Sequence, residues 1–140
     1  MWYGISKCDV LKISDDEIQF LTGEKDIDAG VHKIFEKYEP ALFCATKGKN
    51  GSTAYYKGKS FFADAFVRKD TVETTGAGDT FMACIFNSVL EKGLDNLTKS
   101  DVSSMLEFAS AASSIITTKK GALKVMPQRN DVISFLNNYK

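Results

Sequence analysis

Several features that would indicate a particular class of protein are missing from this chain of 140 residues. The 18 basic and 18 acidic residues give a formal net charge of zero, and no long basic run occurs, so a nucleic-acid-binding surface is not indicated. No apolar run approaches the roughly 20 residues of a membrane span, and the N-terminus lacks the basic-then-apolar layout of a signal peptide. We therefore expect neither nucleic acid nor a membrane among the partners.

Cysteine is also scarce. The three cysteines, Cys8, Cys44 and Cys84, are odd in number, lie far apart and form no C-x-x-C pair. Neither a disulfide framework nor a zinc site is therefore indicated. Reduced thiols fit a cytoplasmic protein best.

The residues that are present favour a folded α/β domain. A composition of 44% hydrophobic and 26% charged residues indicates one globular domain with a real core. Strand-like segments alternate with helix-like segments, which predicts a layered α/β domain with a largely parallel sheet. The expected strands are residues 10–13, 41–46, 52–57 and 60–67.

Helix signals separate these strands. Residues 14–17 (SDDE) match a capping box that opens a helix, which Gly23 would end. Apolar residues at helical spacing predict a second helix that stops before Pro40. They predict a third, marked by residues 81–90, that ends near Gly93, and a fourth that starts at the cap Asp101. The same spacing predicts a last helix after Asn130 or Asp131.

The most informative segment is residues 72–80 (VETTGAGDT), where two glycines flank an alanine and Asp79 follows just as a helical pattern begins. Glycines let the backbone approach a ligand, and the start of a helix offers unpaired N–H groups to an anion. Asp79 could then accept a proton. Alternatively, Asp79 is only a carboxylate favoured by the helix dipole.

Four motifs in order resemble the ribokinase-like (PfkB-type) sugar kinases. Residues 73–79 (ETTGAGD) resemble the family signature D-T-x-G-A-G-D, and residues 12–23 resemble K-x-N-x-x-E…L-T-G. Residues 46–51 resemble the T-x-G-x-x-G turn, and residues 120–122 the late G-A loop. The tail at residues 121–127 is most similar to the fructokinases. The resemblance implies an α/β, three-layer ribokinase-like (Rossmann-like) sheet with flanking helices.

The resemblance covers only the C-terminal half of such an enzyme. Residues 1–140 would then be its nucleotide-binding and catalytic half, without the N-terminal half that carries most sugar-binding groups and the lid. We expect this fragment to be inactive alone. Strand edges and apolar surface left uncovered would favour self-association of the fragment.

The implied activity is transfer of a phosphoryl group from ATP to a sugar hydroxyl, with Mg²⁺ as cofactor. Such transfer needs positioning and charge stabilisation more than covalent chemistry. Backbone amides at Gly76, Ala77, Gly78 and Asp79 would form the anion hole, and the Asp79 carboxylate would act as base. The other functional class is a non-catalytic nucleotide-binding or protein-interaction module on the same fold.

Two glutamates are candidate metal-site residues. By resemblance, Glu17 would help organise Mg²⁺ through water, although a capping box explains this residue equally well. Ser14 stands where the family has asparagine. Glu73 stands where the family usually has an aspartate that supports a monovalent-cation site, so activation by K⁺ is a further expectation.

The nucleotide itself would contact two loops. Thr46, Gly48 and Gly51 would lie beside the phosphates and ribose, although a plain turn between strands also explains the glycines. Gly121 and Ala122 would line the adenine pocket. Ala111 and Ala112 are candidates for its opposite wall, with helix packing as the alternative.

Overall fold

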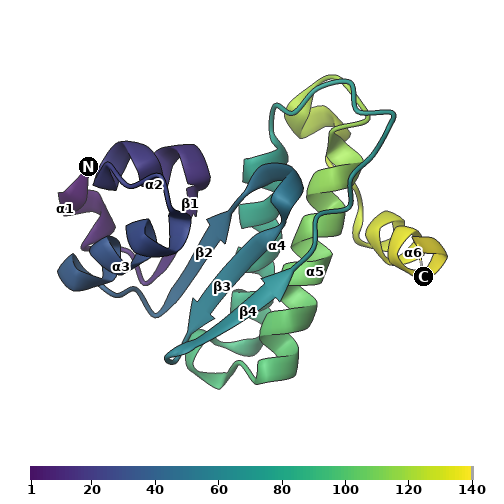
Figure 1. Cartoon of the computed structure of the whole chain (residues 1–140). Coiled ribbons are helices and arrows are strands. Elements are labelled where there is room, and N and C mark those ends of the chain that lie inside the picture. The colour runs from purple at the N-terminus through teal and green to yellow at the C-terminus, as the bar shows by residue number, and fades with distance from the viewer. Residues whose placement is uncertain (140) are drawn as a thin grey trace. The chain divides into compact units, whose positions relative to one another are not determined.

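The computed structural model describes residues 1–139 and divides the chain into two compact units, residues 1–62 and 63–140. Figure 1 shows their elements. The first unit contains α1 (Trp2–Ile5), β1 (Val10–Ser14), α2 (Asp15–Thr22), α3 (Ile27–Lys37), β2 (Leu42–Thr46), η1 (Gly48–Asn50) and β3 (Ser52–Tyr56), and β4 (Lys59–Ala63) ends at the boundary. The second contains α4 (Ala77–Lys92), η2 (Leu94–Asn96), α5 (Lys99–Ile116), η3 (Ala122–Val125) and α6 (Arg129–Tyr139).

The four strands form one sheet in the order β1-β2-β3-β4. The pair β1 and β2 is parallel, whereas β2 and β3 are antiparallel, so the sheet is mixed and the expectation of a largely parallel sheet was wrong. The reason is the length of the connections: the short turn after β2 cannot make the crossover that a parallel pair needs. Lys57 and Gly58 both have positive φ, which suits the tight turn between β3 and β4.

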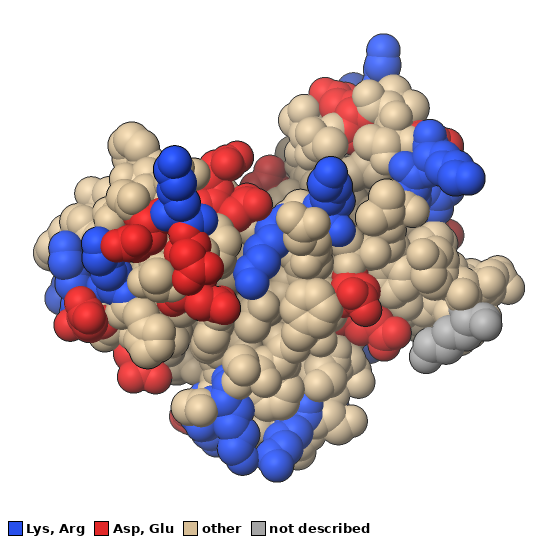
Figure 2. Space-filling model, viewed as in Figure 1, with Lys and Arg blue, Asp and Glu red and all other residues tan. Residues whose placement is uncertain are grey.

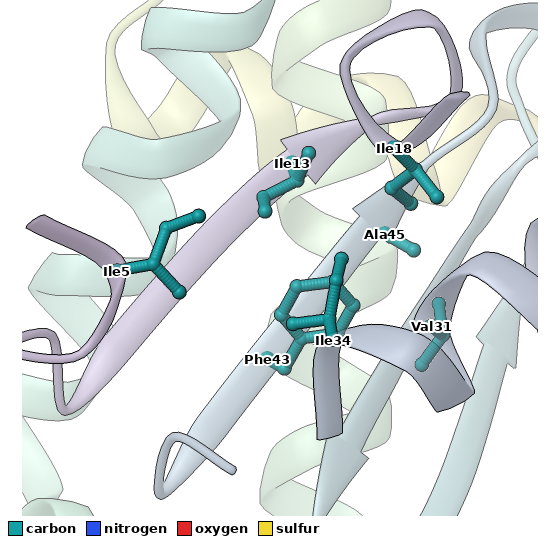
Figure 3. Close-up of a cluster of buried hydrophobic side chains, with 7 residues drawn as sticks. All are labelled: Ile5, Ile13, Ile18, Val31, Ile34, Phe43 and Ala45. Carbon is teal, nitrogen blue, oxygen red and sulfur yellow. The ribbon is translucent and has the colours of Figure 1, made fainter. Parts of the chain in front are cut away.

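An apolar core lies on one face of this sheet. Figure 3 shows the side chains of α2 and α3 meeting those of β1 and β2. The predicted capping box is confirmed: the Ser14 hydroxyl accepts from the Glu17 amide, and Gly23 ends α2 in the left-handed conformation. The cluster consists of Ile5, Ile13, Ile18, Val31, Ile34, Phe43 and Ala45.

Gly30 lets α2 and α3 approach each other. A Cβ atom at this position would collide with the Ile18 side chain. Because Ile18 is fully buried, no larger residue fits at position 30 without moving one of the helices.

In the second unit, two predicted helix starts were placed too late. The cap of α5 is Thr98, and Asp101 is instead the third helical residue, whose carboxylate accepts from the Thr98 amide. This carboxylate also binds the Lys92 ammonium, which together with the Thr98 bonds holds the pKa of Asp101 well below its usual range. Helix α6 begins at Arg129, before the predicted Asn130 or Asp131.

The strand expected over residues 60–67 ends at Ala63. Phe66 leaves the strand direction because its ring packs edge-on against Phe135 and Tyr139 of α6. The Ser114 hydroxyl of α5 donates to the Phe66 carbonyl oxygen at 2.5 Å, which fixes this departure. Tertiary packing has therefore overridden a local strand preference.

Three further observations concern the whole described chain. None of the helices within residues 1–139 is long and apolar enough to cross a membrane. The three cysteines are free thiols. Lys and Arg are interspersed with Asp and Glu over the face seen in Figure 2.

Candidate active site

The glycine turn forms the N-terminus of α4. Gly76 precedes the helix with φ 83°, a left-handed conformation that glycine adopts without strain. The Thr80 amide donates to the Gly76 carbonyl oxygen at 2.9 Å, and the Ala77 amide donates to Thr74 at 3.2 Å. The amides of Gly78 and Asp79 have no backbone acceptor within residues 1–139, and both residues are exposed. These two amides and the positive end of the helix dipole can therefore receive an anion.

A second loop, residues 117–122, holds this turn in place. The Thr117 carbonyl oxygen accepts from the amides of Val72 and Glu73, at 2.8 and 3.1 Å. A Cβ atom on Gly76 would lie 3.3 Å from the Ala122 Cβ, so the glycine turn and the G-A loop are in direct contact. The structure thus brings together two motifs that lie more than 40 residues apart in the sequence.

Ala122 itself has φ 43°, an uncommon conformation for a residue with a side chain. Gly121 before it has φ 119°. Backbone strain of this kind persists only where the surroundings impose it, and it occurs often at ligand sites. The contact with the glycine turn therefore holds this loop in a conformation that is unfavourable for the backbone of Ala122.

Ser113 is a site residue that the sequence did not reveal. Its hydroxyl donates to the Ala77 carbonyl oxygen at 2.9 Å, which ties the first turn of α4 to α5. In the sequence it is one serine in the small-residue run 109–114 (ASAASS), and nothing distinguishes it from its neighbours. Only the packing of α4 against α5 shows that it positions the anion-binding amides.

Glu17 has one carboxylate oxygen engaged and one available. Its Oε2 accepts from the Ser14 amide at 2.7 Å and lies 3.7 Å from the Lys12 ammonium. The Ser14 amide, followed by the Ser14 hydroxyl and Lys12, lowers the pKa of Glu17, so the carboxylate is held ionised. Both of these contacts use Oε2, so Oε1 can accept from a water molecule. Glu17 can therefore cap α2 through Oε2 and bind a metal ion through a water molecule on Oε1.

Glu73 is half-buried, and its amide bonds to Thr117. No group of three or more His, Cys, Asp or Glu side chains that could hold a metal ion occurs within residues 1–139. Neither Glu17 nor Glu73 is therefore part of a ready-made cluster of metal ligands, and each fits an ion only together with water, phosphate or backbone oxygens.

The turn after β2 is a closed loop. The Lys47 amide donates to the Gly51 carbonyl oxygen at 2.8 Å, and Thr46 faces Ser52 across the antiparallel pair. Gly48 and Gly51 have φ of 52° and 87°, and no atom lies within 4 Å of a Cβ built on Gly48. The prediction that these glycines form a turn between two strands is therefore confirmed. The open space at Gly48 leaves room for a ligand beside the turn.

Ala111 and Ala112 take part in helix packing. They are 0% and 1% exposed and form a cluster with Val132 of α6. The adenine-pocket residues expected from the sequence are therefore divided: Gly121 and Ala122 lie at the glycine turn, whereas the two alanines lie where α5 meets α6. Glu17, Thr46, Gly48 and Gly51 belong to the first unit and the remaining site residues to the second.

Comparison with known proteins identifies the family. Residues 3–129 match the family described as pfkB family carbohydrate kinase. The chain belongs to this family. This pfkB family chain is 35% identical over 130 residues to probable fructokinase-2 of Arabidopsis thaliana. The aligned region covers 93% of this chain and 39% of that protein.

Solved structures agree on the fold. A fructokinase from Vibrio cholerae O395, in a form with fructose, ADP and calcium ion bound, has a TM-score of 0.86 at 25% identity, over 96% of this chain and 42% of that one. A ribokinase of Arabidopsis thaliana complexed with ribose and ATP has a TM-score of 0.78 at 27% identity, over 97% and 43% of the two chains. The pfkB family chain therefore has a partial ribokinase-like fold and spans about two fifths of the length of these relatives.

Replacing Gly76 by alanine tests the contact between the two loops. A side chain in the left-handed conformation costs about 1–2 kcal/mol, and at this position the new methyl also meets Ala122 at 3.3 Å. Gly58→Ala is the matched control, because Gly58 has φ 70° but no atom within 4 Å of the added Cβ. We expect Gly76→Ala to lower the free energy of unfolding in urea more than Gly58→Ala does; equal losses would contradict the contact.

Acid titration tests the hydrogen bond that the Ser14 amide donates to the Glu17 carboxylate. Because the pKa of Glu17 is lowered in the folded state, its ionised form stabilises the fold above its ordinary pKa of 4.5, and this contribution is lost as the pH falls through the lowered value. We expect wild type to lose more stability on acidification than Glu17→Gln, with the largest difference between them near neutral pH. The measurement is the urea midpoint as a function of pH, with Glu36→Gln, an exposed glutamate of α3, as control. If the urea midpoints of wild type and Glu17→Gln changed in parallel with pH, the stability of the helix cap would not depend on the charge of Glu17.

Proposed function

We propose that this chain is the C-terminal, nucleotide-binding and catalytic half of a fructokinase-like sugar kinase, which transfers a phosphoryl group from ATP to a sugar hydroxyl. The observation that carries the proposal is the N-terminus of α4, where two exposed amides without backbone acceptors and the Asp79 carboxylate share one helical turn. Membership of the pfkB carbohydrate kinase family supports it.

Asp79 acts as the general base in this proposal. It lies in the first turn of α4 and is exposed, so a hydroxyl group can reach it. As the hydroxyl oxygen bonds to the terminal phosphorus of ATP, its proton passes to the Asp79 carboxylate and ADP leaves with the electrons of the broken P–O bond. A sugar hydroxyl is too weak an acid to ionise by itself at neutral pH.

The amides of Gly78 and Asp79 stabilise the negative charge that spreads over the transferred phosphoryl oxygens. The Ala77 amide is available to them only if it gives up its 3.2 Å bond to Thr74, so we assign it a smaller part. Gly76 contributes through its conformation, because it turns the chain so that these amides face outward. Ser113 holds the same turn from behind through the Ala77 carbonyl oxygen.

The nucleotide contacts are assigned from the resemblance of two loops, one in each unit, to motifs of the family. The open space at Gly48, with Thr46 and Gly51 on either side of that turn, suits the phosphates and ribose. Gly121 and Ala122 suit the adenine end, because the G-A loop lies against the glycine turn. Mg²⁺, when bound, neutralises part of the phosphate charge, and Glu17 would hold one of its water molecules through Oε1. Glu73 remains the residue proposed to support a K⁺ ion.

The sugar must be bound largely by residues outside this chain, which spans about two fifths of its relatives. We therefore propose that the chain by itself has little or no kinase activity. Fructose is the first acceptor to test, because the relatives named above include fructokinases. We also propose that the protein works in the cytoplasm, where thiols such as its three free cysteines stay reduced.

Asp79→Asn tests the proposed chemistry. The assay uses the full reading frame that contains these residues, with fructose, ribose and other sugars as acceptors and ADP release as readout. We expect loss of the base to lower the rate about 10²–10⁴-fold, while the increase in melting temperature on adding Mg-ATP stays unchanged. Undiminished turnover by Asp79→Asn would exclude its role as base. ATP binding without transfer to any acceptor would favour the nucleotide-binding module.

We propose that the 140-residue chain self-associates through the edge of β1, which among residues 1–139 pairs with β2 alone. The Asp9 carbonyl oxygen accepts from the Leu42 amide, so in a parallel pair the amides of Val10 and Lys12 face away from β2. We expect light scattering after gel filtration to show dimers or larger species, and Val10→Pro to reduce them by removing an outward donor. A monomer at all protein concentrations would contradict this proposal.

A further inference from the structure

The chain reaches the glycine turn of α4 through an irregular stretch, residues 64–72, which we call the entry segment. It follows β4, belongs to the second unit and contains neither helix nor strand. Within residues 1–139, its one backbone–backbone hydrogen bond before Val72 is local, from the Val67 amide to the Ala65 carbonyl oxygen at 3.1 Å. Because so few backbone bonds hold this segment, side-chain contacts fix most of its path.

One side chain of α6 contacts the entry segment at two points. The Phe135 ring packs edge-on against the Phe66 ring, with 5.5 Å between their centroids. The Arg68 guanidinium lies over the same Phe135 ring, 5.5 Å from its centroid. Both arrangements are attractive, because the face of an aromatic ring carries partial negative charge. Phe135 therefore holds two residues of the entry segment at once.

The Arg68 side chain extends this hold toward the glycine turn. Its Nε and Nη2 donate to the two carboxylate oxygens of Asp70 at 2.9 and 2.8 Å, which makes a bidentate pair. The Arg68 carbonyl oxygen accepts from the Thr71 hydroxyl at 3.1 Å. The next residue, Val72, donates its amide to Thr117. Contacts therefore run without a break from α6 to the start of the glycine turn.

A different residue docks α6 on α5. Val132 is 1% exposed and forms a cluster with Ala111 and Ala112 of α5. Phe135, one turn later, is only half-buried, as are Phe66 and Arg68. A change at Phe135 can therefore release the entry segment while Val132 keeps α6 in place.

We propose that Phe135 and Arg68 are positioning residues for the anion site at the start of α4. They act through the end of the entry segment, where the amides of Val72 and the following Glu73 bond to the Thr117 carbonyl oxygen. Those two bonds hold the glycine turn against the loop that carries Thr117. Helix α6 therefore helps to shape the site although it belongs to neither loop.

The direction of α4 depends on this hold. The amides of Gly78 and Asp79 can stabilise a transferred phosphoryl group only while α4 leaves the turn in a fixed direction. Release of the entry segment loosens that direction without removing a donor. For this catalytic role the inference rests on the proposed function, whereas the coupling of α6 to the turn does not.

Hydrogen exchange of single amides in the 140-residue chain tests the coupling without an enzyme assay. Phe135→Leu removes the ring but keeps an apolar side chain. We expect the amides of Val72 and Glu73 to exchange about tenfold faster than in wild type, because a ring pair and a cation over the ring are lost. The measurement is the exchange rate of each amide by NMR.

Two controls separate positioning from stability. Phe108→Leu should leave Val72 unchanged, because Phe108 packs against the same α5–α6 cluster but forms no ring pair within residues 1–139. The amide of Ile85, a fully buried residue in the middle of α4, reports unfolding of the whole unit. If Phe135→Leu accelerated exchange at Ile85 as much as at Val72, or left Val72 and Glu73 unchanged, the inference would be wrong.

Variants of Arg68 test the second contact. Arg68→Gln removes both the cation over the ring and the bidentate bond to Asp70, whereas Arg68→Lys keeps a cation but loses the bidentate bond. We expect Arg68→Gln to speed exchange at Val72 about threefold and Arg68→Lys to speed it less. Arg129→Gln is the control, because it removes an arginine of α6 that bonds to Glu91 at 2.8 Å. An effect of Arg129→Gln as large as that of Arg68→Gln would contradict the role of Arg68.

The catalytic role is measured in the full reading frame that contains these residues, with ATP and fructose. We expect Phe135→Leu to lower kcat about 10–100-fold while KM for the sugar stays unchanged, because the sugar is bound largely by residues outside this chain. Phe135→Tyr keeps the ring and should retain the kcat of wild type. Faster exchange with an undiminished kcat would exclude both residues from the reaction.

The two measurements distinguish this inference from the proposed function. If wild type transfers no phosphoryl group to any sugar but Phe135→Leu accelerates exchange at Val72 and Glu73, the coupling stands and the proposed function falls. If wild type is an active kinase and Phe135→Leu leaves exchange unaffected, the proposed function stands and the positioning role of α6 falls.

Discussion

The candidate active site depends on one contact, between Gly76 and Ala122. Both residues have positive φ, and the two loops that carry them are joined by the Thr117 carbonyl oxygen, which accepts from Val72 and Glu73. This contact sets the direction in which α4 leaves the turn, and therefore where the amides of Gly78 and Asp79 point. A β-carbon on Gly76 would already be tight against Ala122. Glycine in this motif thus serves to close the site as well as to admit a ligand.

The local signals in the sequence were reliable where a short motif determines the structure. The capping box at Ser14 and the stop at Gly23 are confirmed, because side chains three residues apart satisfy helix donors regardless of the rest of the fold. The start of α5 was misplaced because Asp101 and Thr98 form one reciprocal box, and only the structure shows which of them lies outside the helix. The end of β4 was missed because Phe66 is held by α6, far along the chain.

The motifs of the candidate site could be predicted from the sequence, but the residues that hold those motifs in place could not. Residues 73–79 and 120–122 carry a family pattern that the sequence displays directly. Ser113, by contrast, acts through one bond to the Ala77 carbonyl oxygen across two packed helices, and no spacing rule connects residues 36 positions apart. A hollow in the second unit was equally hidden, since it is lined by residues of α4, α5 and α6 that become neighbours only on folding.

The two hydrogen bonds that the Thr117 carbonyl oxygen accepts limit its ability to coordinate a cation. A carbonyl oxygen has two lone pairs, and here each meets an amide of the opposite loop. This oxygen is therefore already saturated, and an alkali cation would have to displace an amide to coordinate it. The two loops are accordingly fastened by the chain's own donors, and the cradle at α4 should keep its shape when alkali salts are replaced by salts of bulky organic cations.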